Sequence, residues 1–185
     1  MLPRTVTHRY TGEQVTFLQT AAETGGEHLL IQVSLPPQGD GPPLHSHLTF
    51  TEEFEVLEGN LTVKVDKRTL NLGVGEKAFV LLGLNHTFTN TTNEPVTFTV
   101  KLTPPSLFEE SMRIHYGLMD DNLTNDKGVP RNLLQLALIL WMQDTLVAGL
   151  PPKFQRALLT GLVKLGKKTG AYKNLEKYTG AALEI

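Results

Sequence analysis

The 185-residue sequence contains no cysteine. Disulfide bonds and thiolate metal sites are therefore excluded, and any metal must be held by nitrogen and oxygen ligands. Charge is also sparse, and 17 basic against 19 acidic residues give a formal net charge of −2, so no overall field attracts nucleic acid. The first fifteen residues lack the apolar run of a secretory signal, and we expect a cytoplasmic protein.

The charge is unevenly distributed along the chain. Residues 131–185 carry eight basic and three acidic residues, a net charge of +5, which leaves −7 for the first 130 residues. This asymmetry could attract a second copy of the chain or an anionic surface, although a solvated helix face is the simpler interpretation. The basic part lacks the interleaved aromatic residues of a nucleic-acid groove, and no helix-turn-helix is recognisable, so we expect no nucleic-acid partner.

Short runs rich in Thr, Val, Leu and Phe fill the first hundred residues, separated by Gly, Pro, Asn and Asp. Apolar and polar residues alternate clearly in "LTVKVD" and "VTFTVKL", as in half-buried strands. The predicted strands cover residues 15–20, 29–35, 53–59, 61–66, 69–72, 77–82, 86–90 and 96–103. Many short strands at close spacing favour a mainly β fold, an antiparallel barrel or sandwich.

After "TPPS" at 103–106 the pattern becomes helical. We predict helices over 131–150 and over 151–170, where the second opens with prolines that suit a first turn. The chain therefore divides into a β-barrel, residues 1–106, and an appended C-terminal helical segment, residues 107–185. Apolar residues of the second helix recur at helical spacing: Phe154, Ala157, Leu158, Gly161, Leu162 and Leu165.

The helical extension carries a large apolar surface that must be buried somewhere. Its first helix contributes Leu133, Leu136, Leu140, Trp141 and Leu146. Gln135, Gln143 and Asp144 interrupt this run, and such interruptions disfavour a membrane span. We expect the helices to pack over the barrel or to extend a homodimer interface, and whether they act as lid, interface or membrane contact stays open.

Two histidines stand one residue apart in "LHSH". On a strand, side chains two residues apart point to the same side, so His45 and His47 can converge on one point. Glu52 follows five residues after His47, and His86 lies on another strand after a glycine-bearing turn. Three imidazoles and one carboxylate can hold a divalent ion and leave coordination positions open.

These segments resemble the two paired motifs of the cupin superfamily, in small RmlC-like jelly-roll proteins. The first motif is a glycine, five residues, His-x-His, a glutamate and a closing glycine, here Gly39, His45, His47, Glu52 and Gly59. The second is matched by Gly75, Gly83, His86 and Asn90, with Leu81 where the family usually has proline. That departure affects a turn and not a ligand. The resemblance covers about residues 28–103.

The resemblance implies an antiparallel jelly-roll barrel in which His45, His47, Glu52 and His86 bind a divalent metal, which in this family is iron, manganese, nickel, zinc or cobalt. It also implies a small-molecule ligand or substrate and a homodimer. We predict a metal-dependent enzyme of dioxygenase type. The alternatives are a Lewis-acid isomerase or lyase and a binding protein without catalysis.

The remaining polar candidates receive structural interpretations. Glu53 and Glu55 are expected on the solvated face of their strand, since neighbouring strand residues face opposite sides. Asn90 is expected to hydrogen-bond in a turn, and His28 and His115 to be isolated structural or surface histidines. No general acid or base can be named. The candidates to line the barrel are Phe50, Phe54, Val56, Val63, Val65, Phe79, Phe88 and Phe98.

Overall fold

Two antiparallel sheets face each other in the N-terminal part of the chain, in a computed structural model that describes residues 2–183. The first sheet has the strand order β1-β2-β3-β10-β5-β8 and the second β11-β4-β9-β6-β7. The strand bounds are β1 Thr5–Thr7, β2 Gln14–Gln19, β3 Leu29–Leu35, β4 His45–Ser46, β5 Thr51–Glu58, β6 Leu61–Val65, β7 Arg68–Leu72, β8 Lys77–Val80, β9 His86–Thr89, β10 Val96–Thr103 and β11 Leu146–Val147. The predicted mainly β class is confirmed, and the eight predicted strands all form.

Alternation along the strands builds the core between the sheets. Every second residue of β3 is buried, and β10 pairs with it so that Phe98 lies opposite Val33 and Val100 opposite Ile31. Phe54 of β5 pairs with Val100 on the other side of β10 and is fully buried. Leu61 and Val63 of β6 and Leu72 of β7 belong to the same buried cluster, so apolar side chains from both sheets meet in one interior.

Gly59, the glycine that closes the first motif, is needed for its backbone geometry. Its φ is +78°, a region that residues with a side chain rarely adopt. A Cβ at this position would also lie 2.6 Å from the carbonyl oxygen of Pro95. The turn from β5 to β6 therefore depends on glycine.

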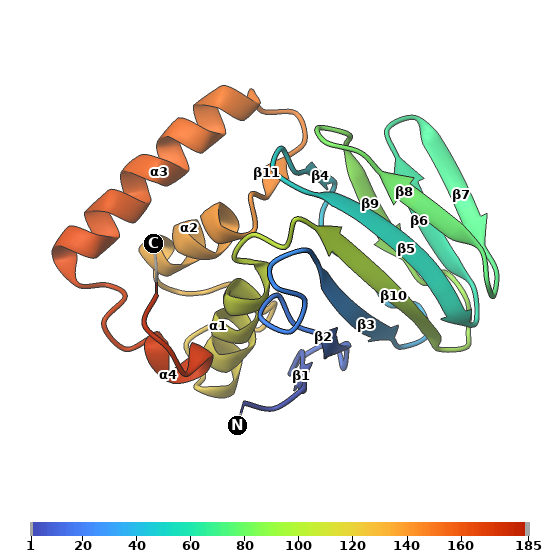
Figure 1. Ribbon diagram of the computed structural model, residues 1–185, viewed down its shortest axis with the longest axis horizontal. Helices are drawn as coiled ribbons and strands as arrows, with labels where there is room; N and C mark the ends of the chain where they lie inside the picture. Colours follow the sequence, from blue (N-terminus) through green and yellow to red (C-terminus); the bar gives the residue numbers. More distant parts are fainter. Residues whose placement is uncertain (1, 184–185) are drawn as a thin grey trace.

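Four helices lie on one side of the sheets in Figure 1. Their bounds are α1 Phe108–Asp120, α2 Leu133–Met142, α3 Pro152–Thr169 and α4 Glu176–Thr179. The Asn132 side chain caps α2 by accepting a hydrogen bond from Leu134 N–H, and α3 ends at the left-handed Gly170. α1, α2 and α3 pack around a second apolar cluster that contains Ile114, Leu138 and Val163.

One expectation about the extension is wrong. The helix predicted over 131–150 ends at Met142, because Asp144 turns the chain at a φ of +46° and β11 then pairs with β4. Leu133, at the start of α2, is 73% exposed and does not pack on the barrel within one chain. Phe154 and Leu158 of α3 are also exposed, since α3 packs through Gln155, Val163 and Gly166.

One predicted barrel residue also faces solvent. Phe79 is 62% exposed, because β8 turns Ala78 and Val80 inward and alternation sends Phe79 outward. Apolar side chains therefore remain exposed on both β8 and α3, and the expected homodimer stays a prediction. Within residues 2–183, no helix combines the length and apolar character that crossing a membrane requires.

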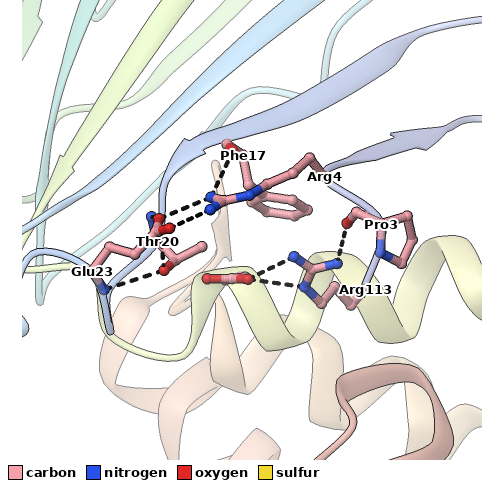
Figure 2. A network of polar contacts seen from close by, with 7 residues as sticks. Pro3, Arg4, Phe17, Thr20, Glu23 and Arg113 are labelled. Atoms are coloured by element: carbon pink, nitrogen blue, oxygen red, sulfur yellow. Dashed lines mark hydrogen bonds and ion pairs between the residues drawn. The ribbon is translucent and has the colours of Figure 1, made fainter. Parts of the chain in front are cut away.

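A polar network fixes α1 to the N-terminal strands (Figure 2). The Arg113 guanidinium lies 4.2 Å from the centre of the Phe17 ring, donates to the Pro3 carbonyl at 2.8 Å and pairs with Glu109. Arg4 donates to the Phe17 carbonyl and pairs with Glu23. Because Arg113 is buried, these partners offset the cost of removing its charge from water, and α1 is held against β2.

Two glycines of α3 give a matched test of how this helix packs. A methyl group at Gly161 meets no atom within 4 Å, whereas one at Gly166 would overlap the buried Tyr172, whose hydroxyl donates to the Leu134 carbonyl at 3.1 Å. We expect Gly161→Ala to stabilise the protein by about 0.5–1 kcal/mol through helix propensity, and Gly166→Ala to destabilise it by about 1–3 kcal/mol. Denaturant unfolding of both variants measures the difference, and equal stabilities would contradict the α2–α3 packing.

Candidate metal centre

Three histidines from adjacent strands form one buried cluster. His45 begins β4, His47 follows that strand, and His86 begins β9 directly opposite His45 in the ladder. One ring nitrogen from each lies within 4.8 Å of the others, and the rings are 1–6% exposed. Alternation on β4 and pairing with β9 are what bring them together, as the sequence predicts.

Each of the three rings is oriented by a contact between its Nδ1 atom and a backbone carbonyl. Nδ1 of His45 lies 2.7 Å from the Pro43 oxygen, Nδ1 of His47 lies 3.2 Å from the Asp144 oxygen, and Nδ1 of His86 lies 3.1 Å from the Leu84 oxygen. Because a carbonyl only accepts, each Nδ1 must donate a proton. In a neutral imidazole the lone pair is then on Nε2, the arrangement found in metal-binding histidines.

Glu52 approaches the cluster from the opposite sheet. It lies on β5, is 7% exposed, and its Oε2 is 2.6 Å from Nε2 of His86. Glu52 is not among the three residues whose ligand atoms all lie within 4.8 Å of one another. The structure therefore places it in direct contact with one histidine, at the edge of the cluster.

Two buried atoms of the cluster have no hydrogen-bond partner among the described residues. They are Nε2 of His47 and Oε2 of Glu52, whose close approach to His86 lacks hydrogen-bond alignment. A buried polar atom without a partner costs about 1–3 kcal/mol. Both atoms belong to the group formed by His45, His47, Glu52 and His86, so the free-energy cost of leaving them without partners falls on this one site.

The electrostatics favour the protonation states that metals require at two of the histidines and at the carboxylate. Burial, followed by repulsion from His86 and His47, lowers the pKa of His45 to about 4, and burial also lowers the pKa of His47. Burial alone would raise the pKa of Glu52, but the neighbouring histidines outweigh it and the pKa falls. For His86, burial lowers the pKa but Glu52 outweighs it and raises the pKa, which makes the neutral form that binds a metal less favourable at this ring than at the other two.

Aromatic side chains pack against one member of the cluster, His47. The Phe50 ring stacks on His47 with centroids 4.2 Å apart, and Phe108 of α1 meets the edge of Phe50 at 5.8 Å. Asp144, in the turn after α2, supplies the carbonyl for His47, and its Oδ2 accepts from Leu48 N–H at 2.5 Å. The position of His47 thus depends on residues from the helical extension.

A cavity of about 460 Å³ opens onto the cluster. His45, His47, Glu52 and His86 line it, together with barrel residues such as Val33 and Val100. Residues of α1 and α2, among them Phe108, Met112 and Ile139, complete the wall. The extension therefore encloses the space in front of the four predicted ligands.

The other sequence candidates lie elsewhere. Glu53 and Glu55 pair with Lys77 on the outer face, and Asn90 donates to the carbonyls of Pro36 and Glu94, so both interpretations are confirmed. His28 contacts Gln19 outside the cavity. His115, expected to be an isolated histidine, lies on the cavity wall.

Sequence reasoning missed several polar residues near the site. Glu13, His8 and Tyr116 all line the same cavity, and Asp144 supports His47. None of them belongs to either motif, and they come from segments distant in the sequence. Only the inward side of β2, on which Glu13 precedes the alternating Val15 and Phe17, could have suggested one of them.

Comparison with known protein families finds a match in the β-strand part of the chain and not in the helical extension. A family model described as a cupin domain matches residues 31–101, which include all four predicted ligands. No curated protein sequence matches the chain.

Solved structures resemble about half of the chain. One is a sugar phosphate isomerase of the cupin superfamily from Silicibacter pomeroyi, with 26% identity and a TM-score of 0.47, covering 52% of this chain and 62% of that one, which is less than two thirds of its length. Another is a predicted oxalate decarboxylase from Thermotoga maritima, with 19% identity and a TM-score of 0.48, covering 56% and 93%. A third is an RmlC-like cupin from Shewanella frigidimarina, with 18% identity and a TM-score of 0.46, covering 54% and 82%.

The Asp144 side chain offers a test of the turn that carries the carbonyl bonded to His47. Asp144→Ala removes the acceptor for Leu48 N–H and places alanine at a positive φ, so we expect a loss of about 2–3 kcal/mol in stability. Asp144→Asn keeps an acceptor oxygen and tolerates that φ, and we expect a loss below about 1 kcal/mol. Thermal unfolding compares the two, and similar losses would contradict the role given to this side chain.

Proposed function

We propose, from the premise that residues 31–101 of this chain form a cupin domain, that the protein is a metal-dependent enzyme of dioxygenase type acting on a small, largely apolar molecule. Its metal ligands are His45, His47, Glu52 and His86. The observation that carries this proposal is the pair of unpartnered buried atoms, His47 Nε2 and Glu52 Oε2, in a cluster whose histidines all use Nδ1 for backbone carbonyls. A shared cation would satisfy both atoms.

The donor set fits such an ion. Three imidazole nitrogens and one carboxylate oxygen suit iron, manganese, cobalt, nickel or zinc, and do not distinguish between them. The carbonyl contacts at Nδ1 fix the tautomer of each ring, so little reorganisation is needed for binding. When bound, such a metal supplies a Lewis acid for substrate oxygen atoms and, if it is redox-active, a centre for oxygen chemistry.

The chain itself supplies a shaped cavity with largely apolar walls. Phe50 stacks on His47 and Phe108 packs against Phe50, so aromatic side chains cover that side of His47. The cavity volume of about 460 Å³ lies in the range of small-molecule sites, and its walls are mainly apolar. An apolar substrate would therefore gain from burial next to the cluster.

The charge of the cavity favours this substrate class over a phosphorylated sugar. Lys127 is the one lysine or arginine among the described residues that line it, and it lies at an exposed position. Phosphate groups are usually bound by several cationic or backbone donors. A dioxygenase acting on an aromatic or dicarbonyl compound is the better match, and a Lewis-acid isomerase or a non-catalytic binding protein would show itself in the test below.

Oxygen consumption tests the reaction class. We expect the iron-loaded protein to consume oxygen with a member of a panel of catechols and 1,3-diketones, and His86→Ala to lose at least about 100-fold in rate, as expected when a metal ligand is removed. His28→Ala, which changes a histidine outside the cavity, is the matched control and should retain the wild-type rate.

Three results would contradict the dioxygenase proposal. Equal turnover without oxygen would indicate isomerase or lyase chemistry. Binding of panel compounds without turnover would indicate a binding protein. Equal rates in His86→Ala and wild type would separate any activity from the histidine cluster.

Metal removal should lower stability, because two buried atoms lose the partner that we assign to them. A ligand present at 100 times its dissociation constant contributes about 2.7 kcal/mol. For a chain of this size, that corresponds to a fall of about 5–10 °C in Tm after chelation. Thermal scans with and without a chelator measure it, and an unchanged Tm in metal-containing protein would contradict the assignment.

A further inference from the structure

A second group of polar side chains lines the cavity away from the histidine cluster. Glu13 lies immediately before β2, and Tyr116 and His115 lie on α1. His8 also faces the cavity from the segment after β1. All four lie outside residues 31–101, so they are features of this chain that the matched cupin domain does not include.

The hydrogen bonds within this group leave acceptors free. Tyr116 O–H donates to Oε1 of Glu13 at 3.2 Å, and His115 Nε2 donates to the Gly128 carbonyl at 2.9 Å. Nδ1 of a neutral His115 is then an acceptor. Within residues 2–183, no hydrogen bond reaches Oε2 of Glu13 or Nδ1 of His115.

His8 adds a donor to the same group. Its Nδ1 accepts from Thr11 N–H at 3.2 Å, so the proton of the neutral ring is on Nε2. The ring packs edge-on against Tyr116, with centroids 5.9 Å apart. Glu13 and His115 therefore each keep a free acceptor and His8 keeps a free donor, and all three residues line the same cavity, with both histidine rings packed against Tyr116.

Burial shifts the pKa values in this region, and Oε2 of Glu13 is an acceptor in the ionised form of that side chain. Burial raises the pKa of Glu13 and lowers the pKa values of His8 and His115. Burial and the nearby Glu13 raise the pKa of Tyr116 well above its usual value, so its hydroxyl stays a donor. An anionic substrate group would be repelled by the free acceptors of Glu13 and His115. A cationic group would lose hydration on burial, which is the same effect that lowers the pKa values of the two histidines.

α1 sets the separation between the two polar regions. Phe108, at its start, contacts Phe50, which stacks on His47. Tyr116 lies eight residues further along, about 12 Å at the rise of an α-helix. The cavity wall also includes apolar side chains, among them Met112, which lies between Phe108 and Tyr116 on α1, and Val33 of β3. A molecule of about two linked rings could contact both regions.

We propose that Glu13, His115 and His8 bind a neutral hydroxyl group of an elongated, otherwise apolar substrate whose other end lies at the histidine cluster, with Tyr116 positioning Glu13. This inference rests on the proposed function only for the assignment of the other end of the molecule. A hydroxyl matches the group because it donates to Glu13 or His115 and accepts from His8. An unpaired acceptor in such a site discriminates strongly against analogues that lack the hydroxyl.

The test compares two biphenyl probes, 4-phenylphenol and 4-methoxybiphenyl, in which a methyl group on the same oxygen removes the O–H donor. Equilibrium dialysis with purified metal-containing protein in excess gives the dissociation constant of each. We expect wild type to bind the phenol about tenfold more tightly than the ether, the value of one buried hydrogen bond. Glu13→Leu should reduce this ratio to about one, and Glu13→Gln, which keeps an acceptor for Tyr116 and nearly the same shape, should reduce it partly.

Matched variants separate this inference from the metal proposal. Tyr178→Phe, which removes a phenol that donates to Asp121 outside the cavity, should leave the ratio unchanged. Metal content measured on the same samples should be equal in wild type and both Glu13 variants. Absence of metal from all three samples, with the binding ratios as expected, would count against the proposed function and not against this inference. Unchanged Tm values in Glu13→Gln check that the fold is retained.

Two results would overturn the inference. One is equal binding of the two probes to wild type, or no measurable binding of either. The other is a preference for the phenol that persists in Glu13→Leu and disappears in His86→Ala, because this would place the hydroxyl at the histidine cluster.

Discussion

The candidate centre depends on one kind of interaction, the hydrogen bond from each histidine Nδ1 to a backbone carbonyl. Pro43, Asp144 and Leu84 supply the three oxygens. Each bond fixes a ring and its tautomer, and in the neutral rings the lone pair is then on Nε2, the nitrogen left to bind a metal. Repulsion and burial would disperse such a cluster if the strands β4 and β9 did not hold it in register.

The helical extension is part of this arrangement and not an addition to a finished barrel. The Asp144 carbonyl reaches His47 from the turn after α2, and β11 continues the sheet that carries His45. Phe108 of α1 braces Phe50 against His47. Arg113 holds the same helix against β2, as Figure 2 shows. The extension thus determines both the orientation of one ligand and the shape of the cavity.

The sequence was informative where a period-two pattern coincided with burial. It predicted the eight longer strands and the convergence of His45, His47 and His86, because alternation and pairing leave few alternatives. It could not predict β11 or the end of α2, since a two-residue strand has no periodicity and Asp144 at a positive φ is stabilised by contacts with Leu48 and His47. Phe79 was predicted to line the barrel because its hydrophobicity does not reveal which side of the strand faces out. The Glu13 and Tyr116 contact joins residues 103 positions apart, and no local pattern indicates it.

The central claim is that His45, His47, Glu52 and His86 share one divalent ion. Elemental analysis of protein purified without added metal or chelator tests it most directly, with wild type beside His47→Ala and His28→Ala. The account predicts close to one divalent transition-metal ion per chain in wild type and His28→Ala, and its loss in His47→Ala. Absence of metal from wild type even after reconstitution, or the same metal content in His47→Ala, would contradict it.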